Sequence, residues 1–201
     1  MSGSTAHPTI LTERLLLRPL ELEDAETVVG WRNDPRNSEL FLSPPPTLEQ
    51  HLAWFTGARP NRLDYVIALR ETGELVGTLN YVLTSEPGVA ETGTLIGAVQ
   101  QRGKGLATEA KVAWTLFGFA TLDVHTIMVR VREDNAPMLH VDRKLGYQDV
   151  GSTVMQNAHG EPHTYRVLRL LRRRVLELPS YDKPEFEGLL SAIRAKETAR
   201  P

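Results

Sequence analysis

The stretch LIGAVQQRGKGLATEA, Leu95 to Ala110, decides the fold of this chain. An apolar run passes into a turn with two glycines, Gly103 and Gly105, and the turn opens directly into an amphipathic helix. Glycines let backbone N–H groups converge without a Cβ in the way, and a helix start adds unsatisfied donors and a positive dipole end. Arg102 and Lys104 supply charge. We therefore predict a strand, turn and helix that cradle a diphosphate.

Spacing separates three kinds of phosphate-binding turn. A nucleoside-triphosphate loop needs Gly, four residues and then Gly-Lys-Ser/Thr, but Ala98 holds the first position and Gly105 follows the lysine. The dinucleotide fingerprint needs a third small residue where Thr108 stands. What remains is the pattern Gln100-x-x-Gly103-x-Gly105. Taken alone, this segment could also be a plain glycine turn with a solvated arginine and lysine.

A second segment downstream carries its own local signals. The run Thr126–Arg132 predicts a strand, Asn135 is suited to cap the helix that follows, and Gly146 is suited to end it. The helix closes on Lys-Leu-Gly-Tyr. Three apolar residues at helical spacing are expected to form its buried stripe: Met138, Val141 and Leu145.

These two segments, Gln100-x-x-Gly103-x-Gly105 and Asn135 to Tyr147, resemble the acetyl-CoA signature and the closing helix of the GNAT superfamily of acyl-CoA-dependent N-acyltransferases. The resemblance covers roughly Leu11 to Leu171. It implies an α/β fold, the GNAT fold, with a central mixed and mostly antiparallel sheet flanked by helices. The parallel strands 91–98 and 126–132 would splay apart, and the gap between them would hold acetyl-CoA as co-substrate.

The rest of the chain supplies the other elements of this fold. We expect a flexible N-terminus over 1–10, an acetyltransferase domain over 11–171 and a C-terminal helical extension over 172–201. The expected elements, in order, are strand 14–20, helices 22–31 and 47–58, strands 65–69, 75–83 and 91–98, helix 104–122, strand 126–132, helix 135–145, and strands 147–155 and 163–171. The extension has an apolar face that must pack on something, and a homodimer is the natural hypothesis: Phe186, Leu189, Leu190 and Ile193.

Composition narrows the class of protein. The chain has 201 residues, 41% hydrophobic and 24% charged, with a formal net charge of −2 and no cysteine. This balance gives no general attraction to nucleic acid or to anionic membranes, and a thiol nucleophile is excluded. No signal peptide or span of about 20 apolar residues is visible, so we expect a cytoplasmic protein. The histidines show no ligand spacing that predicts a metal site.

The resemblance implies transfer of an acetyl group to a primary amine, which needs a base, an oxyanion donor and a proton for the thiolate. Glu91 is the predicted base, since family members often place a carboxylate there; a solvated strand-end glutamate is the alternative. Asp142 occupies the position where many members carry the tyrosine that protonates the thiolate. An ionised carboxylate is a poor proton donor, so His140, Tyr81 or solvent are the other candidates.

The ligand-binding residues follow from the same resemblance. Gly97 could mark a close approach of the ligand or plain tight packing. The predicted acetyl-CoA contacts are Leu95, Ile96, Gly97, Gln101, Arg102, Gly103, Lys104, Gly105, Leu106, Ala107 and Asn135. The predicted acceptor contacts are Trp31, Arg32, Asn33, His51 and Tyr81.

The first two helices resemble the acceptor side of two subgroups, one acting on amino sugars and one on the N-termini of ribosomal proteins. Trp54, at helical spacing from His51, is expected in the core. We expect a small-molecule amine as acceptor, such as an amino sugar or a nucleotide-linked amino sugar. A protein N-terminal acetyltransferase and a non-catalytic acyl-CoA-binding module are the alternatives.

Overall fold

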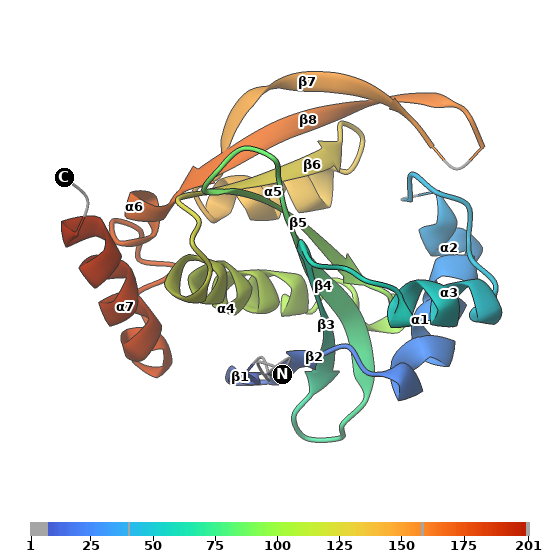
Figure 1. Cartoon of the computed structure of the whole chain (residues 1–201), viewed down its shortest axis with the longest axis horizontal. Coiled ribbons are helices and arrows are strands. Elements are labelled where there is room, and N and C mark those ends of the chain that lie inside the picture. Colours follow the sequence, from blue (N-terminus) through green and yellow to red (C-terminus); the bar gives the residue numbers. More distant parts are fainter. Residues whose placement is uncertain (1–7, 40, 158, 200–201) are drawn as a thin grey trace.

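The computed structural model describes residues 8–39, 41–157 and 159–199, and within them eight strands form one sheet in the order β1-β2-β3-β4-β5-β6-β8-β7 (Figure 1). All neighbours are antiparallel except β5 and β6, which run parallel. The predicted α/β fold with a mixed, mostly antiparallel sheet is confirmed. The strands are β1 Ile10–Leu11, β2 Leu15–Pro19, β3 Arg62–Leu69, β4 Leu75–Leu83, β5 Val89–Ile96, β6 Thr126–Arg132, β7 Gln148–Gln156 and β8 Pro162–Leu171.

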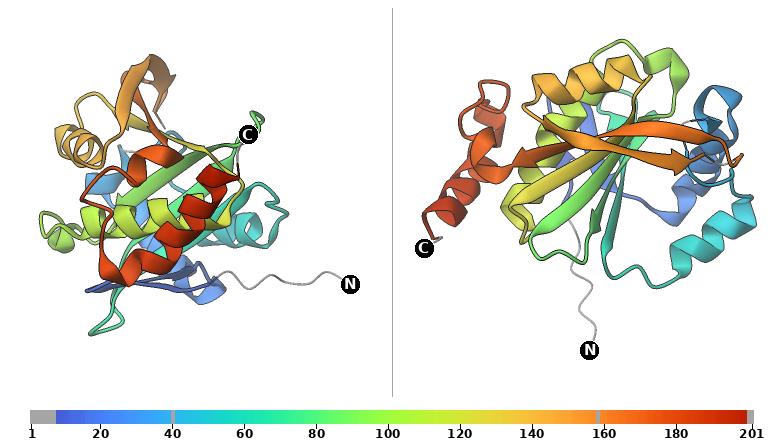
Figure 2. Two further views of the ribbon diagram at one scale, coloured as in Figure 1. Left: turned by 90° about the vertical axis from the view of Figure 1, so that its left-hand side faces the viewer. Right: turned by 90° about the horizontal axis from the view of Figure 1, so that it is seen from above.

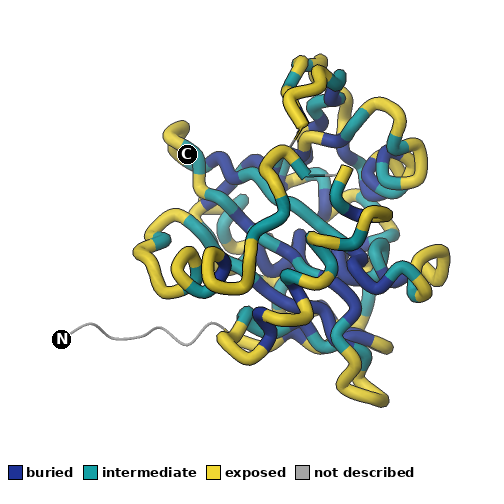
Figure 3. The backbone as a smooth tube through the Cα atoms, turned by 90° about the vertical axis from the view of Figure 1, so that its right-hand side faces the viewer, coloured by how far each residue is buried: buried dark blue, intermediate teal, exposed yellow. Residues whose placement is uncertain are grey.

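The helices lie on both sides of this sheet. Helix α4 packs on the face that carries Tyr65 and Tyr81, both of which contact Trp114 of α4 at centroid distances of 4.7 and 4.6 Å. Because side chains alternate along a strand, Asp64, Thr78 and Asn80 face the other way. The buried backbone runs through the middle of the sheet and α4 (Figure 3). The helices are α1 Ala25–Asn33, α2 Pro35–Ser38, α3 Leu48–Thr56, α4 Leu106–Thr121, α5 Ala136–Lys144, α6 Arg172–Val175 and α7 Glu187–Thr198.

The parallel strands β5 and β6 separate soon after they begin. They pair only at Val89 with Thr126, Ala90 with Ile127 and Glu91 with Met128. Beyond Glu91, β5 keeps its partner β4 as far as Ile96, while its other edge has no strand beside it. The predicted splay is therefore present, and it opens one edge of buried backbone toward a ligand, because unpaired amides there need a partner.

Local sequence signals fixed the helix starts. Thr47 and Gln50 form a capping box at the start of α3, and the Asn135 side chain accepts from the backbone N of Met138 at the start of α5, as predicted. The buried stripe of α5 was predicted correctly at Leu145 and wrongly by one position at Met138 and Val141. The fully buried positions are Leu139, Asp142 and Leu145, whereas Met138 and Val141 are half-buried and line a groove.

The C-terminal segment packs against its own domain (Figure 2). Phe186, Leu190 and Ile193 are buried in the main core cluster, and the Lys196 ammonium donates to the carbonyls of Phe119 and Leu122, at the end of α4, at 3.2 and 2.7 Å. The apolar face that suggested a homodimer is thus covered within the chain, which removes that argument.

Two further expectations concern the N-terminal segment and membrane-spanning helices. Most of the N-terminal segment 1–10 lies outside the described residues. Among the described residues, no helix combines the length and the apolar character that crossing a membrane requires.

Candidate active site

The glycine turn between β5 and α4 has the predicted geometry. Gly103 and Gly105 have φ of 75° and 78°, the left-handed region that glycine enters without steric cost. The first bond from the helix back to the turn runs from Glu109 N to Gly105 O at 3.2 Å. The N–H groups of the three preceding residues, 106–108, have no intrahelical acceptor. They point out of the positive end of α4, so the turn offers an anion several donors at once.

A loop from the opposite edge of the sheet clamps this turn. Glu109 accepts from Thr12 Oγ1 at 2.6 Å and from Arg14 Nε at 2.7 Å, and Arg14 Nη1 also donates to Lys104 O at 2.9 Å. Burial alone would raise the pKa of Glu109, but these hydrogen bonds hold it below its usual value. The carboxylate is therefore neutralised by Arg14 and does not oppose an anion at the helix start.

A groove runs from the turn to the start of α5, and we call it the α4 groove. It brings together most of the predicted acetyl-CoA contacts: Leu95, Ile96, Gln101, Arg102, Gly103, Gly105, Leu106, Ala107 and Asn135. Sequence reasoning missed the remaining lining residues, of which Asp134 is acidic and is paired with Arg132: Arg36, Thr94, Thr108, Arg132, Asp134, Pro137, Met138 and Val141. Lys104 lies outside the lining, where its ammonium donates to Gln101 Oε1 at 2.8 Å. The groove fits a phosphate-bearing ligand, since glycines, free N–H groups and arginines line it together.

Packing against Trp31 explains why position 97 is a glycine. A Cβ at this position would lie 2.2 Å from Trp31 Cδ2, so the indole occupies the space that a side chain would need. Gly97 also donates to Val76 O and accepts from Asn37 Nδ2. Neither Gly97 nor Trp31 lines the α4 groove or either of the two cavities described below. The packing of Trp31 on Gly97 favours the tight-packing alternative for Gly97, and the predicted ligand contact of each residue stays a prediction.

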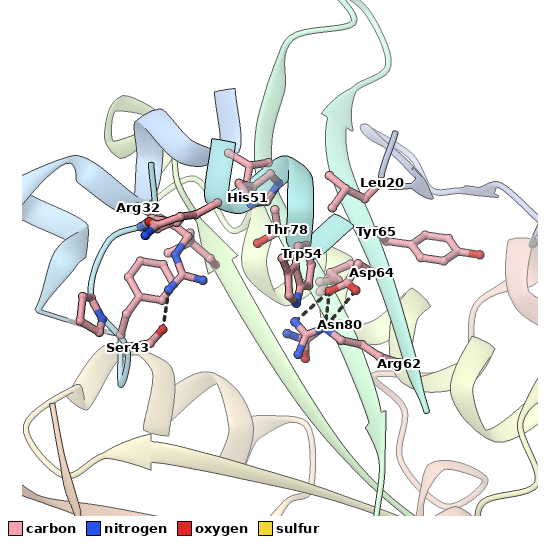
Figure 4. A pocket seen from close by; sticks show the side chains of 17 residues that line it. Leu20, Arg32, Ser43, His51, Trp54, Arg62, Asp64, Tyr65, Thr78 and Asn80 are labelled. Atoms are coloured by element: carbon pink, nitrogen blue, oxygen red, sulfur yellow. Dashed lines mark hydrogen bonds and ion pairs between the residues drawn. The ribbon is translucent and has the colours of Figure 1, made fainter. Parts of the chain in front are cut away.

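A second cavity, which we call the α3 cavity, lies on the opposite face of the sheet and has a volume of about 410 Å³ (Figure 4). That size suits a small ligand. Arg32 reaches it from α1 and donates to Ser43 Oγ at 2.8 Å, and its guanidinium lies 4.4 Å from the ring centre of Phe41. Arg62 reaches it from β3 and donates to Asp64, with Nε 2.8 Å from Oδ1.

The charges in the α3 cavity do not balance. Asp64 accepts from Arg62 and also from Arg59 Nη1 at 2.7 Å. Arg32 forms no ion pair within the described residues, and its Nε is buried without a hydrogen-bond partner. Burial, and then repulsion from Arg62, lowers the pKa of Arg32. The cavity therefore holds a guanidinium that lacks a counter-charge.

His51 and Trp54 of α3 complete the wall. His51 is buried, with Nε2 unpartnered, and burial followed by repulsion from Arg32 and Arg59 lowers its pKa, so the neutral ring is favoured. Trp54 was expected in the core, and this was wrong. Its side chain is 39% exposed and stacks under Arg59, whose guanidinium lies 4.5 Å from the ring centre.

Two further predicted acceptor contacts lie elsewhere. Tyr81 is completely buried on the α4 face, where its hydroxyl donates to Trp114 O at 3.0 Å. Strand alternation is the reason, because the neighbouring Asn80 takes the cavity side instead. Asn33 is exposed and donates to Val29 O and Pro46 O. Both calls are corrected: neither residue lines the α3 cavity.

The α4 groove and the α3 cavity meet where β5 and β6 part. A third cavity, the junction cavity, shares Thr94, Leu95 and Asn135 with the groove and Arg32, Phe41 and Asn80 with the α3 cavity. It is lined by residues from both faces of the sheet: Thr92 and Val129 from the α4 side, Gly93 and Arg130 from the other. The junction therefore passes through the gap between the strands.

The two predicted catalytic carboxylates are both ion-paired. Glu91 stands at the last paired position of β5 and forms two contacts of 2.6 Å with Arg130, which lines the junction cavity while Glu91 does not. Asp142 is completely buried, with Oδ1 2.5 Å from Lys111 Nζ. Asp142 therefore touches no cavity, and Lys111, which sequence reasoning missed, lines the junction. His140 is exposed on the outer face of α5.

Among the described residues, no three histidines, aspartates or glutamates come together in a way that could hold a metal ion. Most of the missed residues of the α3 cavity come from strands and linkers whose side chains meet only in the folded state, and Val28 and Gln50 come from α1 and α3. The alternation of β3 and β4 was the available signal, because it places Asp64, Thr78 and Asn80 on one face.

Comparisons with known proteins agree with this geometry. Residues 14–148 match the model of the acetyltransferase (GNAT) domain. The chain is 30% identical over 150 residues to an uncharacterized N-acetyltransferase, p20, of Bacillus licheniformis, which covers 71% of this chain and 84% of that protein.

Two solved structures share the fold. The structure of RimJ from Mycobacterium smegmatis in complex with CoA-disulfide has a TM-score of 0.74 at 22% identity, covering 92% of this chain and 94% of that one. The structure of spermidine N-acetyltransferase from Vibrio cholerae in complex with CoA and spermine has a TM-score of 0.72 at 18% identity, covering 80% and 96%.

Proposed function

This chain belongs to the GNAT family of acetyltransferases and is an acetyl-CoA-dependent N-acetyltransferase, and from that premise we propose that its acceptor is a small primary amine that also carries an anionic group. Acetyl-CoA is proposed to lie in the α4 groove, with its diphosphate at Gly103 and Gly105. The acceptor is proposed to enter from the α3 cavity, and acetyl transfer to take place in the junction cavity.

The uncompensated guanidinium of Arg32 carries this proposal. Arg32 is half-buried, with a buried Nε that has no partner within the described residues. Withdrawing a cation from water without a counter-charge is costly, and an anion on the ligand would offset that cost. A carboxylate or phosphate can accept two parallel N–H bonds from one guanidinium. The exposed face of Trp54 offers a flat surface for a sugar or base. An amino sugar with a phosphate or nucleotide group combines these features.

A polyamine fits the same wall poorly. It would bring several positive charges into a cavity where Asp64, the acidic residue of its lining, is already shared by Arg59 and Arg62. Like charges at close range repel strongly where water is scarce. The spermidine enzyme of Vibrio cholerae thus shares the fold, but we do not extend its acceptor to this chain.

Glu91 stays the proposed base. It sits where β5 and β6 begin to separate, and alternation places it on the same face of the sheet as Leu95 of the α3 cavity. Its carboxylate is held by Arg130, so a proton could leave the acceptor through water along this pair. Glu91→Gln should lower kcat about 100-fold with little change in KM for acetyl-CoA. A similar kcat for wild type and Glu91→Gln would assign the pair to structure alone.

The first experiment measures thiol release from acetyl-CoA with matched pairs of amines. One pair is an amino sugar with and without a phosphate; further arms are a nucleotide-linked amino sugar, spermidine and short peptides with free N-termini. The protein adds no thiol background because it has no cysteine. We expect the phosphorylated member to have a kcat/KM about 10- to 100-fold above its neutral twin, since hydrogen bonds to charged groups contribute about 1.5–3 kcal/mol.

Other outcomes separate the alternatives. Preference for spermidine would refute the charge argument while leaving the acetyltransferase. Preference for peptides would favour an N-terminal acetyltransferase. If no amine reacted although CoA bound in a calorimetric titration, the chain would be an acyl-CoA-binding module.

A further inference from the structure

The buried ion pair between Lys111 and Asp142 sits at the edge of the junction cavity. Lys111 is on α4 and Asp142 on α5, and their side chains are 4% and 0% exposed. Lys111 lines the cavity together with Thr92 and Val129 of the α4 face. The ammonium thus approaches the gap between β5 and β6 from the face opposite the α3 cavity.

Stability gives no reason for this pair. Two buried charges cost several kcal/mol of desolvation, and replacing such a pair by apolar residues is often neutral or stabilising. The carboxylate of Asp142 has no hydrogen-bond partner within the described residues apart from this contact. The other close neighbour of the ammonium is the ring of Tyr147, with its centre 5.5 Å from Nζ.

The ammonium keeps donors available. An ammonium has three N–H groups, and within the described residues its one close polar contact is Asp142. The other cations of the junction that lie on the sheet are more fully engaged. Arg130 makes two contacts with Glu91, and Arg132 donates to Asp134 and to Glu39 O. Arg32, which also lines the junction, is half-buried and is assigned to the acceptor. Lys111 is therefore the fully buried cation of the junction lining that keeps donors available.

We propose that Lys111, positioned by Asp142, binds the sulfur of CoA and stabilises the thiolate that leaves in acetyl transfer. The inference rests on the proposed function, since it needs acetyl-CoA in the junction. The acceptor nitrogen forms a bond to the thioester carbon, the carbon–sulfur bond breaks, and its electron pair leaves on sulfur. The nitrogen gives its proton to the proposed base, Glu91, by way of water, and the base returns it to solvent. The thiolate gains a proton from water when CoA departs.

This assignment accounts for an aspartate at position 142. Lys111 supplies a fixed positive charge beside the sulfur, and a preorganised charge needs no reorganisation during the reaction. Asp142 holds the ammonium in place and does not contact the substrate. It is a positioning residue, and Lys111 is the catalytic one.

The test is the acidity of the CoA thiol in its complex with the protein. The ultraviolet absorbance of the thiolate is followed against pH with CoA bound, and desulfo-CoA serves as the blank. A positive charge within about 4–6 Å lowers an acidic group's pKa by about 1–3 units, so bound CoA should titrate that far below free CoA. The protein contributes no thiol of its own.

Variants attribute the shift to one side chain. Lys111→Met should abolish it and lower kcat roughly 100- to 1,000-fold, the effect of removing one preorganised donor. Lys111→Arg should keep part of the shift. Lys111→Met leaves Asp142 without its partner, so the double variant Lys111→Met/Asp142→Leu removes both charges and guards against misfolding, with melting temperature as the check. Lys144→Met removes an exposed lysine of α5 and should leave the shift intact.

The outcomes separate this inference from the proposed function. If wild type did not bind CoA in a calorimetric titration, both would fall. If CoA bound with an unshifted thiol, or if the shift survived in Lys111→Met and in Lys111→Met/Asp142→Leu, the role of Lys111 would be refuted and acetyl transfer would stand. A shift present in wild type and Lys144→Met, and absent in the two variants that carry Lys111→Met, supports it.

Discussion

The α4 groove and the α3 cavity are built in different ways. The groove comes almost entirely from two continuous segments, 94–108 and 132–141, and its anion-binding groups are backbone N–H donors at a glycine turn. The cavity draws on α1, the linker after α2, α3 and strands β3 to β5, and its polar groups are side chains. If acetyl-CoA binds in the groove as proposed, backbone geometry would hold the co-substrate. The proposed acceptor would meet side chains, which single substitutions can change.

The two regions also treat charge differently. Beside the groove, Glu109 of the first turn of α4 is neutralised by Arg14, and Asp134 of the groove lining is paired with Arg132. In the cavity, Asp64 is shared by two arginines while Arg32 has no acidic partner within the described residues. Substitutions in one region should therefore leave the affinity for the other region's ligand unchanged.

The largest expected effect is in the groove. Gly105→Val places a β-branched residue at φ 78°, and this backbone strain costs about 1–3 kcal/mol. The substitution also disturbs the N–H donors at the helix start, where each charge–dipole contact contributes about 0.3–1 kcal/mol. We expect kcat/KM for acetyl-CoA to fall roughly 10- to 500-fold, with KM for the acceptor unchanged.

The control is Gly160→Val, at φ 81° in the β7–β8 hairpin and outside the three cavities. It carries similar strain and should not alter acetyl-CoA kinetics. Equal losses in the two variants would mean that global destabilisation, and not the turn, sets the effect.

Arg32→Met is the corresponding substitution in the α3 cavity. We expect kcat/KM for a phosphorylated acceptor to fall about 10- to 100-fold, because a charged hydrogen bond is lost, while KM for acetyl-CoA stays the same. Arg32→Lys keeps the charge and should recover part of the activity. An unchanged preference for the phosphorylated amine in Arg32→Met would remove Arg32 from the acceptor site.

Gly97→Ala tests a position between the two regions. Its Cβ would overlap the indole of Trp31 at 2.2 Å, and overpacking of this kind costs about 1–3 kcal/mol. We expect a lower free energy of unfolding in urea, and partial recovery in Gly97→Ala/Trp31→Leu. A large rise in KM for acetyl-CoA without loss of stability would instead support the predicted ligand contact of Gly97.

The smallest expected effect is the pH dependence that His51 gives to stability. Burial, Arg32 and Arg59 lower its pKa in the folded state, so the unfolded chain binds the proton more readily below about pH 6.5. Wild type should therefore lose stability relative to His51→Gln as pH falls through that range, and the difference between their free energies of unfolding should be constant above it. A difference in free energy of unfolding between wild type and His51→Gln that is the same at pH 7.5 and at pH 5.5 would contradict this.

The contrast between the regions also explains what sequence could predict. The glycine turn, the Asn135 cap and the Thr47 capping box each depend on residues a few positions apart, so the strands, the main helices and most of the groove followed from local pattern. The α5 stripe was right at Leu145 but was displaced by one position before it, because the buried Asp142 takes a place that hydrophobic periodicity assigns to an apolar residue. Its partner Lys111 is distant in sequence.

The α3 cavity was less accessible for the same reason. Arg32 and His51 were found, but Trp54 was assigned to the core because helical spacing says nothing about the two arginines that hold it at the surface. Tyr81 was misplaced because a strand residue can face either side until its neighbours are known. Asp64 gave no signal as a single acidic residue in a strand.

The three tryptophans give the protein a built-in set of optical reporters. Trp54 is 39% exposed in the wall of the α3 cavity, Trp31 lies against Gly97 at the end of β5, and Trp114 is enclosed in the core with its indole N–H 3.0 Å from Thr92 Oγ1. Single-tryptophan variants would let fluorescence follow occupancy of the cavity, movement of the strand end and melting of the core as separate signals.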